Sequence, residues 1–193
     1  METKNNLTKD WNELYWSEAQ QEIKYYDRMF EKYAEDFNLN TVIDYRKIYV
    51  AGPWFKQKDR AIMDLFHKYM KEVYPNAYFP LHEQQITDTP KDSYKNNVDH
   101  LDECDVVVAF VSTFDTGTAY ELGYAKALNK QIILLCWNEK TFTDHGTNLM
   151  LALGADLIYK VIDFMVLSIN QVGDVFKDNE CTIKVKNDWR NVI

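Results

Sequence analysis

The sequence predicts an α/β fold in which helices flank a parallel β-sheet, preceded by an extra N-terminal helical segment. The first observation is that short runs rich in β-branched residues alternate with helix-like segments from Lys47 onward, a pattern typical of parallel strands joined by crossover helices. The second is that residues 1–46 contain no glycine or proline and carry aromatic residues at helical spacing. With 193 residues, of which 46% are hydrophobic, the chain can bury a sizeable core.

The predicted elements follow in order along the chain. Strands are expected in KIYVAGP (47–53), AYFPL (77–81), DVVVAFV (105–111) and QIILLCW (131–137). Helices are expected at 60–74 and 120–128, and residues 97–103 are expected to form the end of a helix. Residues 87–93 are polar and contain Pro90, so we expect a loop there. Beyond Val161 the pattern is less regular, with a possible strand at CTIKVK. This organisation divides the chain into an N-terminal helical extension (1–46), a catalytic domain (47–164) and a C-terminal segment (165–193).

Charge and cysteine content limit the partners and the compartment. A formal net charge of −8 argues against a nucleic-acid backbone or an anionic membrane as the main partner and fits a small neutral or cationic ligand. Cys104, Cys136 and Cys181 have no metal-binding spacing, and free thiols are favoured over a disulfide. The N-terminus has no signal-peptide pattern and no apolar run reaches about 20 residues. We therefore expect a cytoplasmic protein.

A glutamate follows a Gly-Thr turn directly after a buried strand, in the stretch FDTGTAYELGYAKALNK. Ligands bind at the carboxyl ends of strands in such sheets, and Gly52-Pro53, the residues after Leu81, and Asp115–Glu121 all lie there. Gly117 permits a tight turn, and Glu121 is expected in or near the first helical turn, where the helix dipole favours an ionised carboxylate. Such a carboxylate can attack a sugar anomeric carbon, although acidic residues are also common in first turns for the dipole alone.

Asp115 precedes Glu121 by six residues and is expected to face the same cavity. Paired carboxylates are the working parts of retaining glycosyl transfer. The alternative for Asp115 is a turn residue that satisfies its own backbone.

Further side chains with possible roles lie beside the predicted strand ends. Tyr49 is placed to donate a hydrogen bond to the nucleophile, Trp54 or Phe55 to stack on a flat heterocycle, and Gln84 to read a base edge. Core packing is the alternative for the aromatic residues, and a surface position is the alternative for Gln84. The histidines show no metal-ligand spacing, so we expect no metal and no cofactor.

Taken together, these segments resemble the nucleoside 2-deoxyribosyltransferase family from about Lys47 to Phe164. The most specific part is DTGTAYELGYAKALNK followed by Asn148–Met150, and IYVAGPWF, FPLHEQQ and YKNNVDHLDECDVVV follow the family's order and spacing. The resemblance implies a flavodoxin-like (Rossmann-like) sheet. It also implies homo-oligomers with shared active sites that exchange free nucleobases on deoxyribonucleosides with retention.

The resemblance also implies roles for single residues. Glu121 is the nucleophile that forms a deoxyribosyl-enzyme, and Tyr49 orients it. Asp115 holds the sugar and Gln84 reads the base, with Gly52 and Trp54 beside the substrate. Asn148 serves the 5′-hydroxyl end of the sugar in the neighbouring subunit.

One position departs from the usual pattern of the family. Many members carry a proton-exchanging aspartate eight residues before the aspartate that opens the DVVV-type strand, and here that position is Asn97. Asparagine can hydrogen-bond a ring nitrogen but cannot protonate it. Asp99 lies two residues on and points elsewhere on a helix. Some members have asparagine at this position, so the departure bears on the general-acid role and on the range of bases.

Two other functions are compatible with the sequence. One is an N-glycoside hydrolase of deoxynucleosides or nucleoside 5′-monophosphates, but the strand ends offer no Arg or Ser cluster for a phosphate. The other is a non-catalytic nucleotide-sensing module in which the Glu121 constellation is a relic. Base exchange is the favoured prediction.

Overall fold

The protein was examined as a computed structural model. The structure describes residues 43–85, 88–111, 115–136, 149–161 and 163–165, together with residue 176 and parts of a helical stretch between residues 20 and 32.

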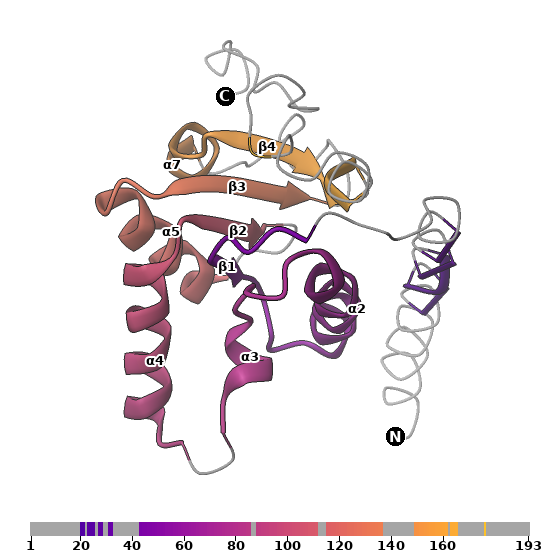
Figure 1. Cartoon of the computed structure of the whole chain (residues 1–193), viewed down its shortest axis with the longest axis horizontal. Helices are drawn as coiled ribbons and strands as arrows, with labels where there is room; N and C mark the ends of the chain where they lie inside the picture. Colours follow the sequence, from indigo (N-terminus) through magenta and orange to yellow (C-terminus); the bar gives the residue numbers. More distant parts are fainter. Residues whose placement is uncertain are drawn as a thin grey trace, which may run out of the picture.

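A parallel sheet forms the centre of the described fold (Figure 1). Its strands, in spatial order, are β1 (Ile48–Ala51), β2 (Val106–Phe110), β3 (Gln131–Cys136) and β4 (Leu157–Lys160). On the other side of β1, Tyr78 forms a single parallel bridge with Tyr49. The strand order therefore reverses at β1, as it does in flavodoxin-like folds. The predicted flavodoxin-like sheet flanked by helices is confirmed.

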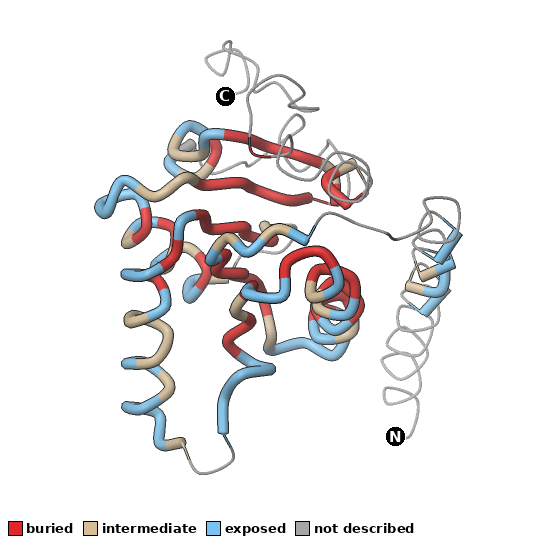
Figure 2. Tube along the Cα trace, in the orientation of Figure 1, coloured by how far each residue is buried: buried red, intermediate tan, exposed pale blue. Residues whose placement is uncertain are grey.

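Helices cover both faces of the sheet, and the core divides accordingly. One face of β1 carries Ile48 and Val50 and packs against α2 (Gln57–Val73). The other face carries Tyr49 and Ala51. The helices packed on that second face are α4 (Pro90–Glu103), α5 (Thr116–Ala127) and α7 (Leu149–Gly154). Figure 2 shows the strands buried along their length, which explains their nearly continuous apolar sequences.

The loop expected at residues 87–93 was wrong from Pro90 onward. Helix α4 begins at Pro90, seven residues before the predicted 97–103 segment. Thr89 accepts from the Asp92 backbone N–H, and the Asp92 side chain accepts from the Thr89 backbone N–H. Proline is favoured at a first helical position because its missing N–H is not needed there, and the reciprocal cap supplies the start signal.

The predicted strand AYFPL is also much shorter than expected. Tyr78 N–H donates to the Ile48 carbonyl at 2.7 Å, and Val50 N–H donates to the Tyr78 carbonyl at 2.9 Å. The chain then enters the short helix α3 (Pro80–Glu83). Proline cannot donate to a strand ladder and is at home at a helix start, so pairing ends after one bridge.

Helix α7 and strand β4 follow β3 without having been predicted, although the run LIYK of β4 is apolar enough to have signalled a strand. The possible strand at CTIKVK lies outside the described residues, as does Cys181. In the N-terminal stretch, the Tyr69 hydroxyl donates to Asp27 Oδ1 at 2.8 Å, and Ile23 packs against the α2 side of the core. No helix of the described part is long and apolar enough to cross a membrane.

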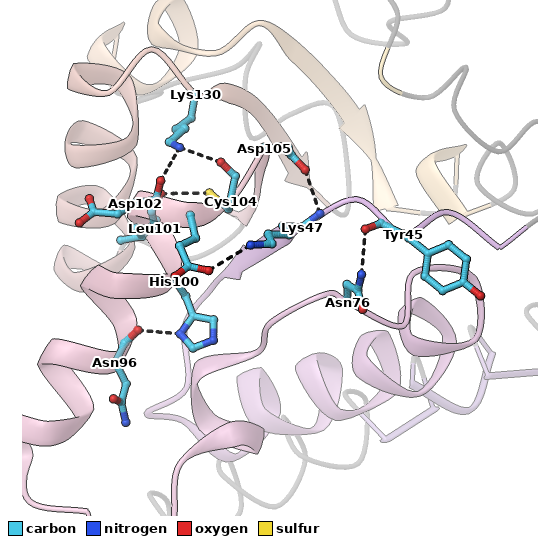
Figure 3. Close-up of polar contacts among 11 residues, drawn as sticks. Tyr45, Lys47, Asn76, Asn96, His100, Leu101, Asp102, Cys104, Asp105 and Lys130 are labelled. Atoms are coloured by element: carbon cyan, nitrogen blue, oxygen red, sulfur yellow. Dashed lines mark hydrogen bonds and ion pairs between the residues drawn. The ribbon is translucent and has the colours of Figure 1, made fainter.

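Polar contacts tie together the amino ends of the strands (Figure 3). Lys47 N–H, just before β1, donates to Asp105 Oδ2 at 3.0 Å. The Lys130 ammonium, just before β3, donates to the carbonyls of Asp102 at 2.6 Å and Cys104 at 2.8 Å. Cys104 and Cys136 are buried free thiols, as expected. These bonds close the amino edge of the sheet and leave the carboxyl edge for a site.

Candidate active site

A cavity of about 240 Å³ opens at the carboxyl ends of β1 and β2, beside the reversal of strand order. Ligands bind at this point in open α/β sheets. The lining includes these residues predicted from the sequence: Gly52, Trp54, Gln84, Asn97, Asp115 and Glu121. The rest of the lining is Phe55, Pro80, Leu81, Gly117 and Thr118. The structure thus brings most of the predicted residues to one cavity, whereas Asn148 lies outside the described residues.

A larger cavity lies elsewhere, between α5 and α7. It measures about 790 Å³ and is mostly apolar, and Lys126 is the charged side chain of its described lining. None of the predicted site residues that the structure describes lines it. Chemistry needs convergent polar groups, so the smaller cavity is the candidate site.

Glu121 lines the cavity, and the predicted site residue Tyr49 lies behind it, outside the lining. The Tyr49 hydroxyl donates to Glu121 Oε1 at 2.7 Å. Tyr49 itself is fully buried within β1, and burial, followed by the Glu121 charge, raises the pKa of its phenol. The phenol is therefore a permanent donor that fixes one carboxylate oxygen of a residue that lines the cavity.

Burial also governs the protonation of Glu121. It raises the pKa of the carboxyl to about 7, with the Tyr49 hydrogen bond lowering the pKa and the Asp115 charge raising it. A carboxylate with this pKa is weakly hydrated and is half ionised near neutral pH.

Glu121, predicted in or near the first helical turn, lies just beyond it. Helix α5 begins at Thr116, which places Glu121 in the second turn, away from the free N–H groups at the helix start. The dipole explanation for an ionised carboxylate was therefore wrong. Burial and the tyrosine hydrogen bond determine its charge instead.

Asp115 occupies the helix start in place of Glu121. It is the N-cap of α5, and its Oδ2 accepts from the Thr118 backbone N–H at 2.7 Å and the Thr118 hydroxyl at 2.8 Å. The structural alternative for Asp115, a residue that satisfies local backbone, is therefore present. Asp115 also lines the cavity, so a capping role and a ligand contact are compatible.

Gly117 serves a different purpose from the one predicted. Its backbone does not adopt a positive φ, so a left-handed turn is not what requires glycine. A Cβ at this position would lie 3.2 Å from Asp115 Oδ2. The absence of a side chain keeps the capping carboxylate and the cavity wall uncrowded.

The opposite wall comes from the segment after β1 and from α3. Trp54 is half-buried, and its ring meets His82 of α3 edge-on with centroids 5.4 Å apart. His82 in turn stacks on His67 of α2 at 3.9 Å. Gln84 ends α3 and is exposed at the cavity rim. These contacts give the wall a flat aromatic surface with an amide beside it.

Sequence reasoning missed two residues near the site. Thr118 is buried and holds the capping carboxylate; its place three residues after Asp115 is the sequence signal of a helix cap. Tyr78 contacts Asn97 and was treated only as part of a strand. No sequence signal marks a contact between residues 19 positions apart on separate elements.

Gly52 allows the backbone to pass closely beneath the cavity. A Cβ there would lie 2.7 Å from Met63 Cε and 3.3 Å from Phe110 Cβ. We expect Gly52→Ala to lower the free energy of unfolding by about 1–3 kcal/mol, because the core must shift to admit the methyl group. Urea unfolding measures this change.

The matched control is Gly123→Ala. Gly123 is an exposed position of α5, and an added Cβ there meets nothing within 4 Å. The substitution should stabilise the protein by about 0.5–1 kcal/mol, because glycine is unfavourable inside a helix. Equal effects of the two substitutions would contradict the close-approach explanation for Gly52.

The Tyr49 hydroxyl is expected to control where on the pH scale Glu121 ionises. Since its hydrogen bond lowers the Glu121 pKa, Tyr49→Phe should raise that pKa. A reaction that needs the carboxylate declines on the acid side of this pKa, so the acid limb of kcat/KM should move to higher pH in the variant. A pH–rate profile of both proteins tests this, and an unmoved acid limb would contradict it.

The described residues contain no cluster of three or more His, Cys, Asp or Glu side chains able to hold a metal ion.

Comparisons with known proteins place this geometry in context. A sequence model described as nucleoside 2-deoxyribosyltransferase matches residues 48–180. No curated protein matches the chain. Among solved structures, the chain is similar to a 2-deoxyribosyltransferase from Bacillus psychrosaccharolyticus (21% identity, 58% of this chain and 84% of that one, TM-score 0.49). It is also similar to one from Leishmania mexicana (25%, 66% and 99%, TM-score 0.48) and to a CMP N-glycosidase from Clostridium botulinum (20%, 59% and 86%, TM-score 0.40).

Proposed function

Because the chain belongs to the nucleoside 2-deoxyribosyltransferase family, we propose that it transfers 2-deoxyribose from one nucleobase to another through a covalent intermediate on Glu121. The observation that carries the proposal is the Tyr49–Glu121 pair. A largely buried carboxylate is held at 2.7 Å by a permanent phenol donor at the edge of a cavity. This arrangement suits a nucleophile that must be positioned, weakly hydrated and ionisable at neutral pH.

The first step breaks the bond between C1′ of the sugar and the base nitrogen. The free oxygen of Glu121 attacks C1′ and forms an ester-like C1′–O bond, while the bonding electrons leave with the base. The departing nitrogen takes its proton from water, because the Asn97 amide can donate a hydrogen bond but is not acidic enough to transfer a proton. Hydrogen bonds to the developing anion lower the barrier to its departure.

The second step reverses the chemistry with a different base. Its ring nitrogen attacks C1′, the C1′–O bond breaks and Glu121 regains its carboxylate, and the new base loses a proton to solvent. Two displacements at C1′ give overall retention.

The rest of the lining positions the two parts of the substrate. Trp54 and the exposed Phe55 supply flat surfaces for the base, and Gln84 offers an amide to the base edge. Asp115 accepts from the sugar hydroxyls across the cavity from the base wall. Gly52 contributes backbone at the end of β1 to the cavity wall, beside the proposed position of the sugar.

The proposal includes homo-oligomers in which Asn148 completes the site of the neighbouring subunit. Mixing inactive Glu121→Gln with Asn148→Ala chains should restore part of the activity after subunit exchange, since mixed interfaces can contain one complete site. Mass spectrometry verifies that the subunits have exchanged. If no activity returns after that, each chain contains a complete site of its own.

A single assay tests the reaction. The protein is incubated with deoxyinosine, with and without free adenine, and the products are separated by chromatography. Deoxyadenosine that forms only with adenine supports transfer. Free deoxyribose without a new nucleoside would indicate the hydrolase instead, and unchanged deoxyinosine would indicate a binding module.

A further inference from the structure

The side chain of Asn97 in α4 is held by Tyr78, the residue that bridges to the outer edge of β1. The Tyr78 hydroxyl donates to Asn97 Oδ1 at 3.1 Å. Asn97 lines the cavity, so this contact lies directly behind its wall. A side-chain amide has one acceptor oxygen and one donor NH2 group, and the contact with Tyr78 occupies the oxygen.

Tyr78 is itself firmly positioned. Its backbone forms both hydrogen bonds of the bridge to β1, at 2.7 and 2.9 Å. Its ring stacks on His100 with centroids 3.6 Å apart and an interplanar angle of 14°, and it contacts the Tyr49 ring at 5.6 Å. The hydroxyl therefore reaches Asn97 from a side chain that is held by two neighbouring rings.

His100 is fixed in the same way. Its Nδ1 lies 2.8 Å from the Asn96 carbonyl (Figure 3). A carbonyl oxygen only accepts, so Nδ1 carries the hydrogen and donates. The stack that supports Tyr78 therefore has one ring orientation.

The tyrosine remains a donor throughout the neutral range. Burial raises the pKa of Tyr78 to about 12, with the charges of Glu83, Asp88 and Glu121 acting in the same direction. Asn97 Oδ1 is the acceptor for this hydroxyl among the described residues, and no described group accepts from Asn97 Nδ2. The NH2 group is thus the part of the amide left for an occupant of the cavity.

We propose that Tyr78 is a positioning residue that orients the Asn97 amide so that its NH2 group donates a hydrogen bond to the base, which makes an acceptor atom on that base edge the specificity requirement of the site. This inference rests on the proposed function and adds the substrate class. The preferred bases carry a ring nitrogen or a carbonyl oxygen where Asn97 meets them, as N3 and N7 of purines or O2 of pyrimidines do. The donor also stabilises the base as it departs with the bonding electrons.

The experiment compares adenine, 3-deazaadenine and 7-deazaadenine as acceptor bases, with deoxyinosine as the common donor. Each analogue replaces one acceptor nitrogen by C–H. The rate ratio of adenine to each analogue is measured in the wild type, Tyr78→Phe and Asn97→Ala. Comparing ratios between variants cancels the intrinsic reactivity of the bases.

For one of the two analogues, the wild-type ratio should exceed the Asn97→Ala ratio by about tenfold, the effect of one hydrogen bond to a partly buried group. Tyr78→Phe keeps the ring stack and removes only the hydroxyl, and its ratio should fall most of the way toward that of Asn97→Ala. The matched control is Tyr124→Phe, which removes the hydroxyl that donates to Asp102 at 2.8 Å outside the cavity, and its ratios should equal those of the wild type. A Tyr78→Phe variant that is slower on all bases with unchanged ratios would overturn the proposal, as would wild-type ratios that match Asn97→Ala for both analogues.

A second readout does not depend on catalysis. In Asn97→Asp, the Tyr78 hydroxyl should donate to the new carboxylate and lower its pKa relative to Tyr78→Phe/Asn97→Asp, by about one unit. NMR titration of carbon-labelled aspartate measures both values. Equal values would overturn the contact itself. If the wild type has no exchange activity but the two Asn97→Asp proteins show the expected pKa difference, the proposed transfer reaction is rejected and the orientation of Asn97 is supported.

Discussion

Glu121→Gln should abolish base exchange and make the protein more stable at neutral pH. The amide cannot attack C1′, so we expect kcat/KM to fall by more than about 10³-fold, as happens when a covalent nucleophile is removed. In the wild type, peptide mass spectrometry after rapid quenching with a deoxynucleoside should find a deoxyribosyl adduct on Glu121. The variant should show no adduct.

The gain in stability follows from the pKa of Glu121. Its folded pKa is raised from the ordinary 4.5 to about 7, so the protonated carboxyl favours folding below pH 4.5 and this advantage is lost as pH rises to 7. Glutamine carries no charge to desolvate and still accepts from Tyr49. We therefore expect about 1–3 kcal/mol of extra stability at pH 7, and little at pH 4.

Glu103→Gln is the matched control for this prediction. It removes a charge from an exposed glutamate paired with Lys47 at 3.1 Å, and it should change neither activity nor stability appreciably. Near-normal exchange in Glu121→Gln, or an adduct on another residue, would contradict the assignment of the nucleophile. A loss of stability at pH 7 would contradict the desolvated carboxylate.

Replacing Asp115 should separate its capping role from its proposed contact with the sugar. Asparagine caps helices about as well as aspartate, so Asp115→Asn should unfold like the wild type, whereas Asp115→Ala should lose about 1 kcal/mol. Both should lose about 10- to 100-fold in kcat/KM, because the charged acceptor for the sugar is gone. Denaturant unfolding and initial rates at one pH measure the two effects.

The Asp115 variants have a second signature. The Asp115 charge raises the Glu121 pKa, so Asp115→Asn should move the acid limb of the pH–rate profile to lower pH, opposite to Tyr49→Phe. Full activity in Asp115→Asn would show that the carboxylate serves the helix alone. A profile that moves in the same direction as that of Tyr49→Phe would contradict the charge interaction.

The sequence predicted β1, β2 and β3 well because both faces of the sheet are covered and their apolar runs are unbroken, as in β2. It missed β4. It also misplaced Pro80 in a strand and Pro90 in a loop, whereas each begins a helix. Proline ends a strand or starts a helix equally well, so local sequence does not decide between the two.

The cavity could be predicted as a set of residues but not as a set of interactions. Strand ends determine which side chains meet, which is why Glu121 and Asp115 share a cavity. The ionisation of Glu121 depends on its exact helical turn and burial, and Asn97 contacts Tyr78, 19 positions away on a separate element. Neither can be derived from local spacing.

The base wall is joined to the sheet by one bridge, between Tyr78 and Tyr49, before the chain turns into α3. Glu121, the proposed nucleophile, and Asp115, the proposed sugar contact, belong instead to α5 and its N-cap. Insertions, deletions or grafts between Pro80 and Gln84 would therefore remodel base recognition while the parallel ladder and the covalent chemistry stay intact. The α3 segment is therefore a suitable target for engineering new nucleoside preferences. A library of variants confined to it would change base selectivity while leaving Glu121 and Asp115 unchanged.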